Sequence, residues 1–305
     1  MSVAQQLSPN IAGKQWPALP LEEWEDTFHT LHMWTQIVGK VRMAFTPLHN
    51  HWWNTTLYVN TSGLTTSPIP YRGEIFEIQL DFIKHVLEVR TSYGASRAVA
   101  LAPKSVAAFY HEVLSALQAI GIEVEINTKP QEVPNAIPFD RDEVHHAYDA
   151  EYANRFWRIL LSTHLVFEEF RARFIGKSSP VHFFWGSFDL ATTRFSGRAA
   201  PPRRGVITSE AYSHECSSLG WWPGSRELKG AAFYAYTAPA PPGLGEQRVR
   251  PGAAFFHKQF GEFLLMYDDA RRASSPSDEI LAFAESTYEA GADLAGWDRA
   301  SLERK

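Results

Sequence analysis

Acidic, phenolic and imidazole side chains alternate in the segment Glu210-Ala211-Tyr212-Ser213-His214. The pattern predicts a strand over 205–215, and side chains two residues apart on a strand point to the same face. A carboxylate, a phenol and an imidazole on one surface are typical of general acid–base catalysis. The alternative is a solvated strand face on which His214 pairs with a neighbouring strand.

Two more histidines lie beside tryptophans in segments that resemble each other, 50–53 and 182–185. Both histidines are expected to face inward, because they alternate in phase with apolar residues. A single inward histidine more often completes hydrogen bonds in a core, but two in matched positions would line a shared pocket. The predicted catalytic residues are therefore Glu210, Tyr212, His214, His182 and His51.

A metal-assisted version of this site is the second form of the hypothesis. Its ligands would be His182, Glu210 and His214, which would have to converge within about 2.0–2.2 Å of one ion. The sequence contains no GxGxxG, P-loop, GxSxG, HExxH or CxxC motif, and this disfavours nucleotide cofactors, serine hydrolase chemistry and zincin chemistry. A single metal ion is the one cofactor that the pattern suggests.

Substrate-binding candidates lie around these residues. Trp53, Trp185 and Trp222 would form apolar walls. Asp189 and Arg194 would hold a charged substrate, or would pair with each other. The segment 221–224 is predicted to be a loop that carries exposed rings, either as a lid or as a packing plug.

A third cluster occurs near the middle of the chain. If the helix predicted over 142–174 begins there, Asp142, His145 and Asp149 share one face, and the carboxylates orient His145. An ordinary acidic first helical turn is the favoured interpretation. The single cysteine, Cys216, is expected to be a buried and inert thiol.

Hydrophobic periodicity predicts the elements that must position these side chains. In the first half we expect a helix over 21–44, a strand over 53–59 and a helix from Pro103 to Gly121. Further strands are expected at 76–82, 86–89, 98–101, 181–190, 231–236 and 260–267, and a closing helix at 275–296.

The order of elements repeats, which predicts two α-β-β-β-β-α halves at 21–126 and 139–299, joined by a proline-rich linker at 127–138. Matched residues such as Arg42 and Arg171 favour an internal duplication, although chance similarity of composition is the alternative. The predicted fold class is α+β, with antiparallel sheet packed against helices and a cleft between the halves.

Composition limits the class of protein. Aromatic residues make up 13% of the 305 residues and the net charge is −5, which favours a large core or cleft and disfavours nucleic-acid binding. One cysteine excludes a disulfide scaffold. Neither a long apolar run nor a signal-peptide pattern over 1–20 is present, so we expect a soluble, cytoplasmic protein.

The segments described above resemble a large bacterial family known only as a domain of unknown function, DUF5996. The resemblance runs from Asn50-His51-Trp52-Trp53 through 179–190 to 288–297 and includes 63–71, 138–149, 195–198 and 210–215. It implies one family unit and a bacterial source, and it implies no activity. Cys216 and His49 fall outside the family pattern.

The sequence thus supports two hypotheses. The first is a small-molecule enzyme with an acid–base or metal-assisted site in an aromatic cleft between the halves. The second is a non-catalytic module that uses the same cleft to hold a small molecule or a partner chain. Substrate, reaction and oligomeric state stay open.

Overall fold

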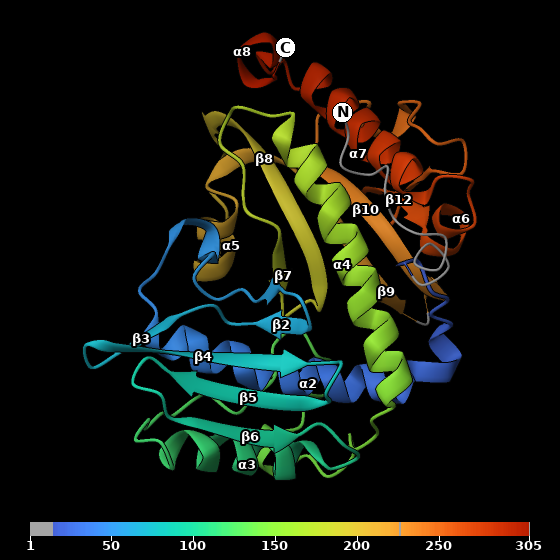
Figure 1. The fold of residues 1–305 in the computed structure, drawn as a ribbon. Coiled ribbons are helices and arrows are strands. Elements are labelled where there is room, and N and C mark those ends of the chain that lie inside the picture. The colour runs from blue at the N-terminus through green and yellow to red at the C-terminus, as the bar shows by residue number, and fades with distance from the viewer. Residues whose placement is uncertain (1–14, 226, 305) are drawn as a thin grey trace.

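The computed structural model describes residues 15–225 and 227–304 as an α+β protein with two antiparallel six-stranded sheets. The first 14 residues, most of the polar N-terminal stretch, lie outside the described residues. Each sheet thus has two strands more than the four expected in each half. Helices lie against both sheets, as expected for this fold class (Figure 1).

The first half contains helices α2 (Leu21–Phe45) and α3 (Val106–Gln118) and the first sheet. Its strand order is β1-β2-β4-β5-β6, and β3 pairs with β4 outside this path. The strands are β1 (Tyr58–Val59), β2 (Gly63–Thr65), β3 (Ile69–Tyr71), β4 (Glu74–Asp81), β5 (Val86–Thr91) and β6 (Ser96–Ala100). A short 3₁₀ helix, η2 (Asn50–Trp52), precedes β1, and another, η3 (Phe139–Arg141), follows the linker.

The second half contains the longer sheet, in the order β11-β12-β10-β9-β8-β7. Its strands are β7 (His182–Phe184), β8 (Asp189–Ala199), β9 (His214–Ser225), β10 (Gly230–Ala238), β11 (Phe255–His257) and β12 (Glu262–Met266). Its helical elements are α4 (Ala150–Ala172), α5 (Val206–Ala211), η4 (Leu244–Glu246), α6 (Tyr267–Arg271), α7 (Pro276–Leu294) and α8 (Arg299–Leu302). Helices α4 and α7 lie across one face of this sheet (Figure 1).

Local signals explain where the helices begin and end. The side chain of Ser105 accepts a hydrogen bond from the backbone N–H of Ala108 and caps α3, and Gly121 ends it with φ +81°. Asp149 caps α4 in the same way, because its carboxylate accepts from the N–H groups of Glu151 and Tyr152. Pro276 begins α7.

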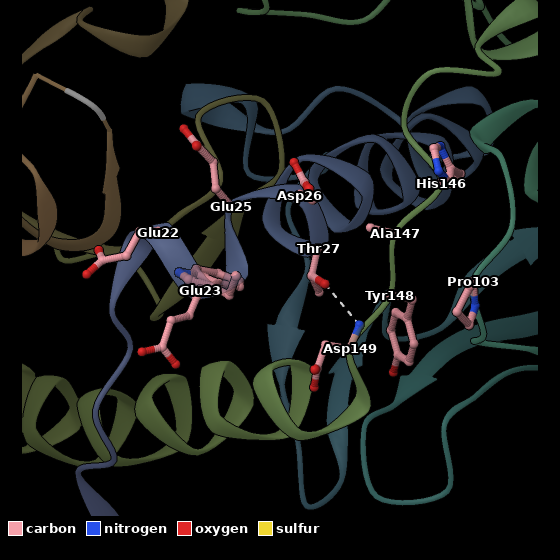
Figure 2. Close-up of a pocket in the computed structure, with 11 residues that line it drawn as sticks. Glu22, Glu23, Glu25, Asp26, Thr27, Pro103, His146, Ala147, Tyr148 and Asp149 are labelled. Carbon is pink, nitrogen blue, oxygen red and sulfur yellow. Dashed lines mark hydrogen bonds between the residues drawn. The ribbon is translucent and has the colours of Figure 1, made fainter.

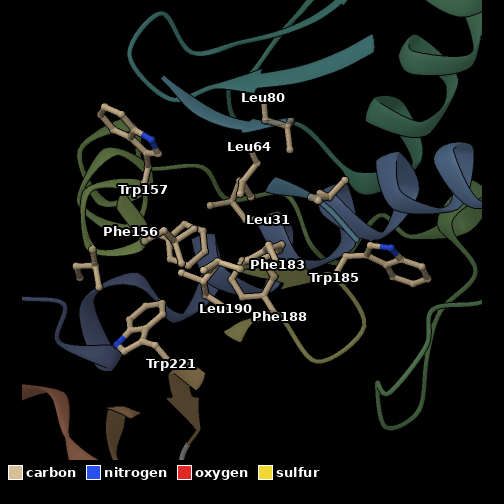
Figure 3. Packing of buried hydrophobic residues seen from close by; sticks show 14 of the residues in the cluster. Leu31, Leu64, Leu80, Phe156, Trp157, Phe183, Trp185, Phe188, Leu190 and Trp221 are labelled. Atoms are coloured by element: carbon tan, nitrogen blue, oxygen red, sulfur yellow. The ribbon is translucent and has the colours of Figure 1, made fainter. Parts of the chain in front are cut away.

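The main core lies where the two halves meet (Figure 3). Phe156 of α4 stacks on Phe188 with ring centroids 5.0 Å apart, and Phe188 also packs against Phe28 of α2. Leu31 of the first half and Trp221 of the second are both fully buried in this cluster. One continuous core therefore serves both halves.

Backbone contacts also join the halves. Leu57 and Phe183 exchange two backbone hydrogen bonds of 2.9 and 2.8 Å, and β1 and β7 lie next to each other there. The indole of Trp157 on α4 donates to the carbonyl of Asn60 in the β1–β2 turn at 3.1 Å. His32 on α2 makes a 2.8 Å hydrogen bond with the carbonyl of Gly186 in the β7–β8 turn. Each half thus places its long helix on a turn of the other half.

Arg42 and Arg171 play similar parts at the ends of α2 and α4. The Arg42 guanidinium donates to the carbonyls of Asn54 and Thr56 at 2.9 and 2.6 Å, and that of Arg171 donates to Ser179 at 2.5 Å. These parallels fit an internal duplication, which stays a prediction.

Five expected elements are wrong in type or extent. The segment 181–190 is not one strand, because a turn separates β7 from β8, which begins only at Asp189. The segment 205–215 is not one strand, because Val206–Ala211 forms α5 and β9 begins only at His214. The strand expected over 53–59 is reduced to β1. The carbonyls of Asn54 and Thr56 accept hydrogen bonds from Arg42 instead of pairing with a neighbouring strand. The helix expected from 142 begins at Ala150. The segment 221–224 is part of β9 rather than a loop.

Within the described part of the chain, no helix is both long enough and apolar enough to cross a membrane.

Candidate active site

His51 lies in a strained turn between α2 and β1. Its φ is +57° and that of Trp52 is +62°, the left-handed region that non-glycine residues rarely adopt. Such strain costs of order 1–3 kcal/mol per residue and persists where the surrounding contacts hold it. The turn buries His51, whose exposed fraction is 5%.

The short helix α5 holds this turn in place. The backbone N–H of His51 donates to Oε1 of Glu210 at 3.0 Å, and its Nδ1 donates to the carbonyl of Ala211 at 3.1 Å. The indole N–H of Trp52 donates to the carbonyl of Ile207 at 3.2 Å. Glu210 is therefore brought to His51 from a helix, although Glu210, Tyr212 and His214 do not share a strand face.

Lys177, which no sequence pattern indicated, completes the polar group. Its Nζ lies 2.7 Å from Nε2 of His51. It also lies over the rings of Phe195 and Trp53, 4.7 and 5.6 Å from their centroids. The base of the side chain is fixed, because the Lys177 carbonyl accepts from the backbone N–H of Phe195 at 3.0 Å.

We call this group the His51 site. It comprises His51, Lys177, Glu210 and His214 with the aromatic walls Trp53 and Phe195. The His51 ring stacks on Phe195 with centroids 4.6 Å apart and meets the edge of His214 at 5.7 Å. His214 also contacts Ser213, whose Oγ lies 3.1 Å from its Nδ1.

Hydrogen bonding fixes the proton on His51. A carbonyl oxygen can only accept, so Nδ1 carries the proton, and neutral His51 presents an unprotonated Nε2 to Lys177. Burial lowers the pKa of His51, and the nearby Lys177 charge lowers it further. Burial also lowers the pKa of Lys177, opposed by Glu210. Both groups are therefore shifted toward their unprotonated forms.

His182 lies deeper, next to the site but not in it. Its ring is 5.6 Å from Trp53 and 5.5 Å from Tyr58, and the side chain is fully buried. Neither ring nitrogen has a hydrogen-bond partner among the described residues. Burial, with smaller contributions from Arg42 and Arg171, lowers the pKa of His182 to about 3.

Asp189 on β8 and Tyr212, which follows α5, both contact the tyrosines of β10, Tyr234 and Tyr236. The hydroxyls of Tyr212 and Tyr236 lie 3.1 Å apart. Asp189 accepts hydrogen bonds from Tyr234 and from Ser187. Burial raises the pKa of Asp189 to about 6, although these bonds lower it.

Cys216, on β9, packs with Phe195 in a small core cluster. It is 3% exposed, and burial raises the pKa of its thiol to about 12. Its predicted inertness fits this environment.

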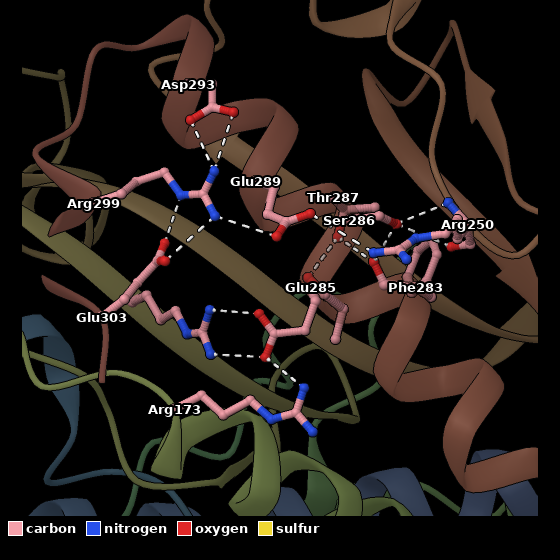
Figure 4. A network of polar contacts seen from close by, with 12 residues as sticks. Arg173, Arg250, Phe283, Glu285, Ser286, Thr287, Glu289, Asp293, Arg299 and Glu303 are labelled. Carbon is pink, nitrogen blue, oxygen red and sulfur yellow. Dashed lines mark hydrogen bonds and ion pairs between the residues drawn. The ribbon is translucent and has the colours of Figure 1, made fainter. Parts of the chain in front are cut away.

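Arg194 points to the opposite side of β8 from Asp189, and the two do not pair. It is buried against Phe170, 3.4 Å from the ring centroid, and pairs with Glu285 of α7 at 3.2 Å. Glu285 belongs to a network of charges that links α4 and α7 (Figure 4). In a neighbouring group of ion pairs, Arg299 contacts Glu289, Asp293 and Glu303. The environment of Arg194 is thus that of a structural ion pair.

The other predicted walls are separated. Trp53 lies in the His51 site. Trp185 is buried against Gly39 of α2, and its indole donates to the carbonyl of Thr55 at 2.6 Å. Trp222 is half-buried on β9, where it pairs with Ala232 of β10.

Asp142 and His145 form a pair, but on a loop instead of a helix. Oδ2 of Asp142 lies 2.7 Å from Nδ1 of His145, and Oδ1 accepts from the backbone N–H groups of Val144 and His145. A cavity of about 470 Å³ opens close by, and its lining includes four acidic residues of α2, Glu22, Glu23, Glu25 and Asp26 (Figure 2). Asp149 lines this cavity, and its N–H donates to Thr27 at 2.9 Å. None of the residues of the His51 site lines it.

The metal ligands expected from the sequence do not converge. Across residues 15–225 and 227–304, no three His, Cys, Asp or Glu side chains are placed so that they could hold a metal ion. The metal-assisted form of the hypothesis therefore has no ligand set among these residues.

The sequence predicted His51, Glu210, His214 and Trp53 but missed Lys177 and Phe195. Lys177 lies in the irregular segment between α4 and β7, where nothing in the local pattern marks it. Phe195 reads as an ordinary core position of a strand. Only the return of β8 beside the 50–52 turn brings them to His51.

Comparison with known proteins gives one match. The model of a family described as a family of unknown function (DUF5996) matches residues 16–304. No curated protein and no solved structure matches the chain.

Proposed function

We propose that this chain, which belongs to the family of unknown function DUF5996, is an enzyme. The geometry of the His51 site supports the transfer of a proton to or from a small molecule there. His51 is the general base and acid, Lys177 binds or activates the substrate, and Trp53 and Phe195 form the apolar walls. Glu210 positions His51 through its backbone N–H.

One observation carries the proposal. His51 Nε2 lies 2.7 Å from Lys177 Nζ while Nδ1 is bound to the Ala211 carbonyl. A histidine with one tautomer and a partner that exchanges protons is the arrangement that general acid–base catalysis requires. The strained turn supports the proposal, because non-glycine residues in the left-handed region cluster at functional sites.

The alternative is a binding module without catalysis. It would use the same aromatic walls and would hold its ligand by the Lys177 ammonium instead of transferring a proton. The two functions differ in whether a bound compound is changed.

The test is turnover in a mixture of small molecules. The full-length protein is incubated with a cell extract freed of macromolecules, and mass spectrometry follows compounds that appear or disappear. We expect at least one compound to change with the wild type. With His51→Gln the change should slow by about 10²-fold or more, the usual contribution of a general base.

The matched control is His49→Gln, two residues away on the surface and outside the His51 site. It should behave as the wild type. Loss of turnover in both variants, or no difference between His51→Gln and the wild type, would rule out proton transfer at His51. A compound that binds and is depleted without product would support the binding module instead.

A further inference from the structure

The surroundings of Lys177 differ from those of an ordinary surface lysine. Among the described residues, no carboxylate oxygen lies within 4.0 Å of its ammonium group. Its nearest polar neighbour is the unprotonated Nε2 of His51, at 2.7 Å. Two aromatic faces, those of Trp53 and Phe195, lie against it. Burial of part of the side chain lowers the pKa of Lys177, and the ring faces and the more distant carboxylate of Glu210 are what stabilise its cation within the protein.

A nucleophilic lysine needs these conditions. Attack on a carbonyl carbon requires the neutral amine, which low polarity and a neighbouring base both favour. Lys177 is an exposed residue, whereas His51 next to it is buried. A reagent from solvent therefore reaches the Lys177 side chain before it reaches the imidazole of His51.

We propose that Lys177 forms a Schiff base with an aldehyde or ketone, and that His51 moves the protons of this step. The inference rests on the proposed function, since it names the substrate class of the same site. The aromatic walls favour a carbonyl compound with an apolar substituent.

The step balances in atoms and charge. His51 Nε2 takes one proton from the Lys177 ammonium, and the neutral amine attacks the carbonyl carbon to form a C–N bond. A proton moves from this nitrogen to the carbonyl oxygen and gives a neutral carbinolamine. Protonated His51 then donates to the hydroxyl, the C–O bond breaks and water leaves. The products are a protonated imine, one water molecule and neutral His51.

The arrangement also explains why His51 is held so firmly. The same Nε2 must first accept a proton and then return it, and this requires a ring that does not rotate. The hydrogen bond from Nδ1 to the Ala211 carbonyl and the stacking of the imidazole on the Phe195 ring fix the plane of the His51 ring. His51 thus acts twice in one step without changing its tautomer.

Reductive trapping tests the proposal. The full-length protein is treated at pH 7 with 2-butanone or propanal and sodium cyanoborohydride, and peptide mass spectrometry gives the rate of alkylation at each lysine. We expect Lys177 to be alkylated at least about tenfold faster than the exposed lysines Lys84 and Lys258, because the Lys177 amine is in hydrogen-bond contact with an imidazole nitrogen that can take its proton.

Two variants complete the test. His51→Gln should reduce the Lys177 rate about tenfold or more while the rates at Lys84 and Lys258 stay constant, because only the proton transfer is lost. Lys258→Met, the matched control, should leave the Lys177 rate unchanged. Circular dichroism of each variant shows that it is folded.

The outcomes separate the two proposals. Alkylation of Lys177 no faster than that of Lys84 and Lys258 overturns the Schiff base, even if His51-dependent turnover is found. Rapid trapping at Lys177 that does not depend on His51 overturns the role of His51 in this step. Selective trapping without turnover of any compound would keep the inference and reject the proposed function.

Discussion

His182 shows how an inward histidine can be structural and costly at once. It is fully buried with both ring nitrogens unpaired among the described residues, and its pKa is lowered to about 3. Since the pKa is about 6.5 in the unfolded chain, a proton binds the unfolded state more tightly than the folded one. His182 therefore destabilises the fold as the pH falls from about 6.5 toward 3, and has no such effect above 6.5.

We predict that His182→Leu makes the protein more resistant to acid. Protonation of His182 in the unfolded chain should account for about 2 kcal/mol of the stability lost between pH 7.5 and pH 5, because pH 5 lies 1.5 pH units below its unfolded pKa. The fall in the free energy of unfolding between these pH values, measured with urea, should be smaller in the variant by about that amount. At pH 7.5 the variant should lose little, because no hydrogen bond is removed.

His111→Leu, at an exposed position on α3, is the control for replacing a histidine outside the core. His32, whose pKa burial lowers to about 4, should still contribute to acid unfolding in every variant. An equal loss of stability between the two pH values in wild type and His182→Leu would contradict the prediction.

At the scale of elements, the contact between α2 and the β7–β8 turn decides how the halves fit. Gly39 on α2 lies beneath the Trp185 ring, and a Cβ at this position would come within 2.2 Å of ring atoms. The small residue is what allows the indole to reach the Thr55 carbonyl.

We predict that Gly39→Ala destabilises the protein by about 1–3 kcal/mol, since the overpacking outweighs the roughly 1 kcal/mol that alanine gains over glycine in a helix. Gly252→Ala is the matched control, because a Cβ there would meet nothing within 4 Å. Urea unfolding measures both. A Gly39→Ala protein as stable as the wild type would mean that Trp185 is free to move.

The regular elements were the part of the fold that the sequence could predict. Periodicity found α2, α3, α7, β4 and β5 because their apolar residues repeat over many positions. Periodicity gave the wrong structure for 205–215 and 53–59, because contacts between segments distant in sequence determine the backbone conformation there. Alternation of Glu210, Tyr212 and His214 looked like a strand, but the carbonyl and carboxylate of α5 bind the distant His51 turn.

For the candidate site, too, local patterns could be predicted and contacts between distant segments could not. His51, Glu210 and His214 were found by residue type, and their partner Lys177 was not, because its role depends on the 2.7 Å contact across 126 positions of sequence. No local pattern in a single sequence indicates a contact between residues so far apart.

At the scale of the whole molecule, the two halves share one core and exchange helix contacts. Trp157 of α4 binds the β1–β2 turn and His32 of α2 binds the β7–β8 turn. The long helix of each half therefore depends on the other half for a hydrogen-bond partner of one of its buried side chains. We therefore expect the halves to unfold as one cooperative unit, despite the linker between them.

We predict a single unfolding transition, with tryptophan fluorescence and far-ultraviolet circular dichroism giving the same midpoint in urea. The separate fragments 15–126 and 139–304 should be unfolded or aggregated when expressed alone, because each would expose the face that includes Leu31 or Trp221. Two resolved transitions, or a stable fragment, would show that the halves are independent domains.

The lone cysteine gives a way to search for ligands before any reaction is known. A cysteine attacks a disulfide reagent only as the thiolate, and Cys216 is both buried and held as a thiol. The rate of its modification therefore measures how often the sheet opens around Phe195, which also forms a wall of the His51 site. A compound that occupies the site slows this opening in proportion to its binding, so thiol exchange can rank candidate substrates by affinity alone.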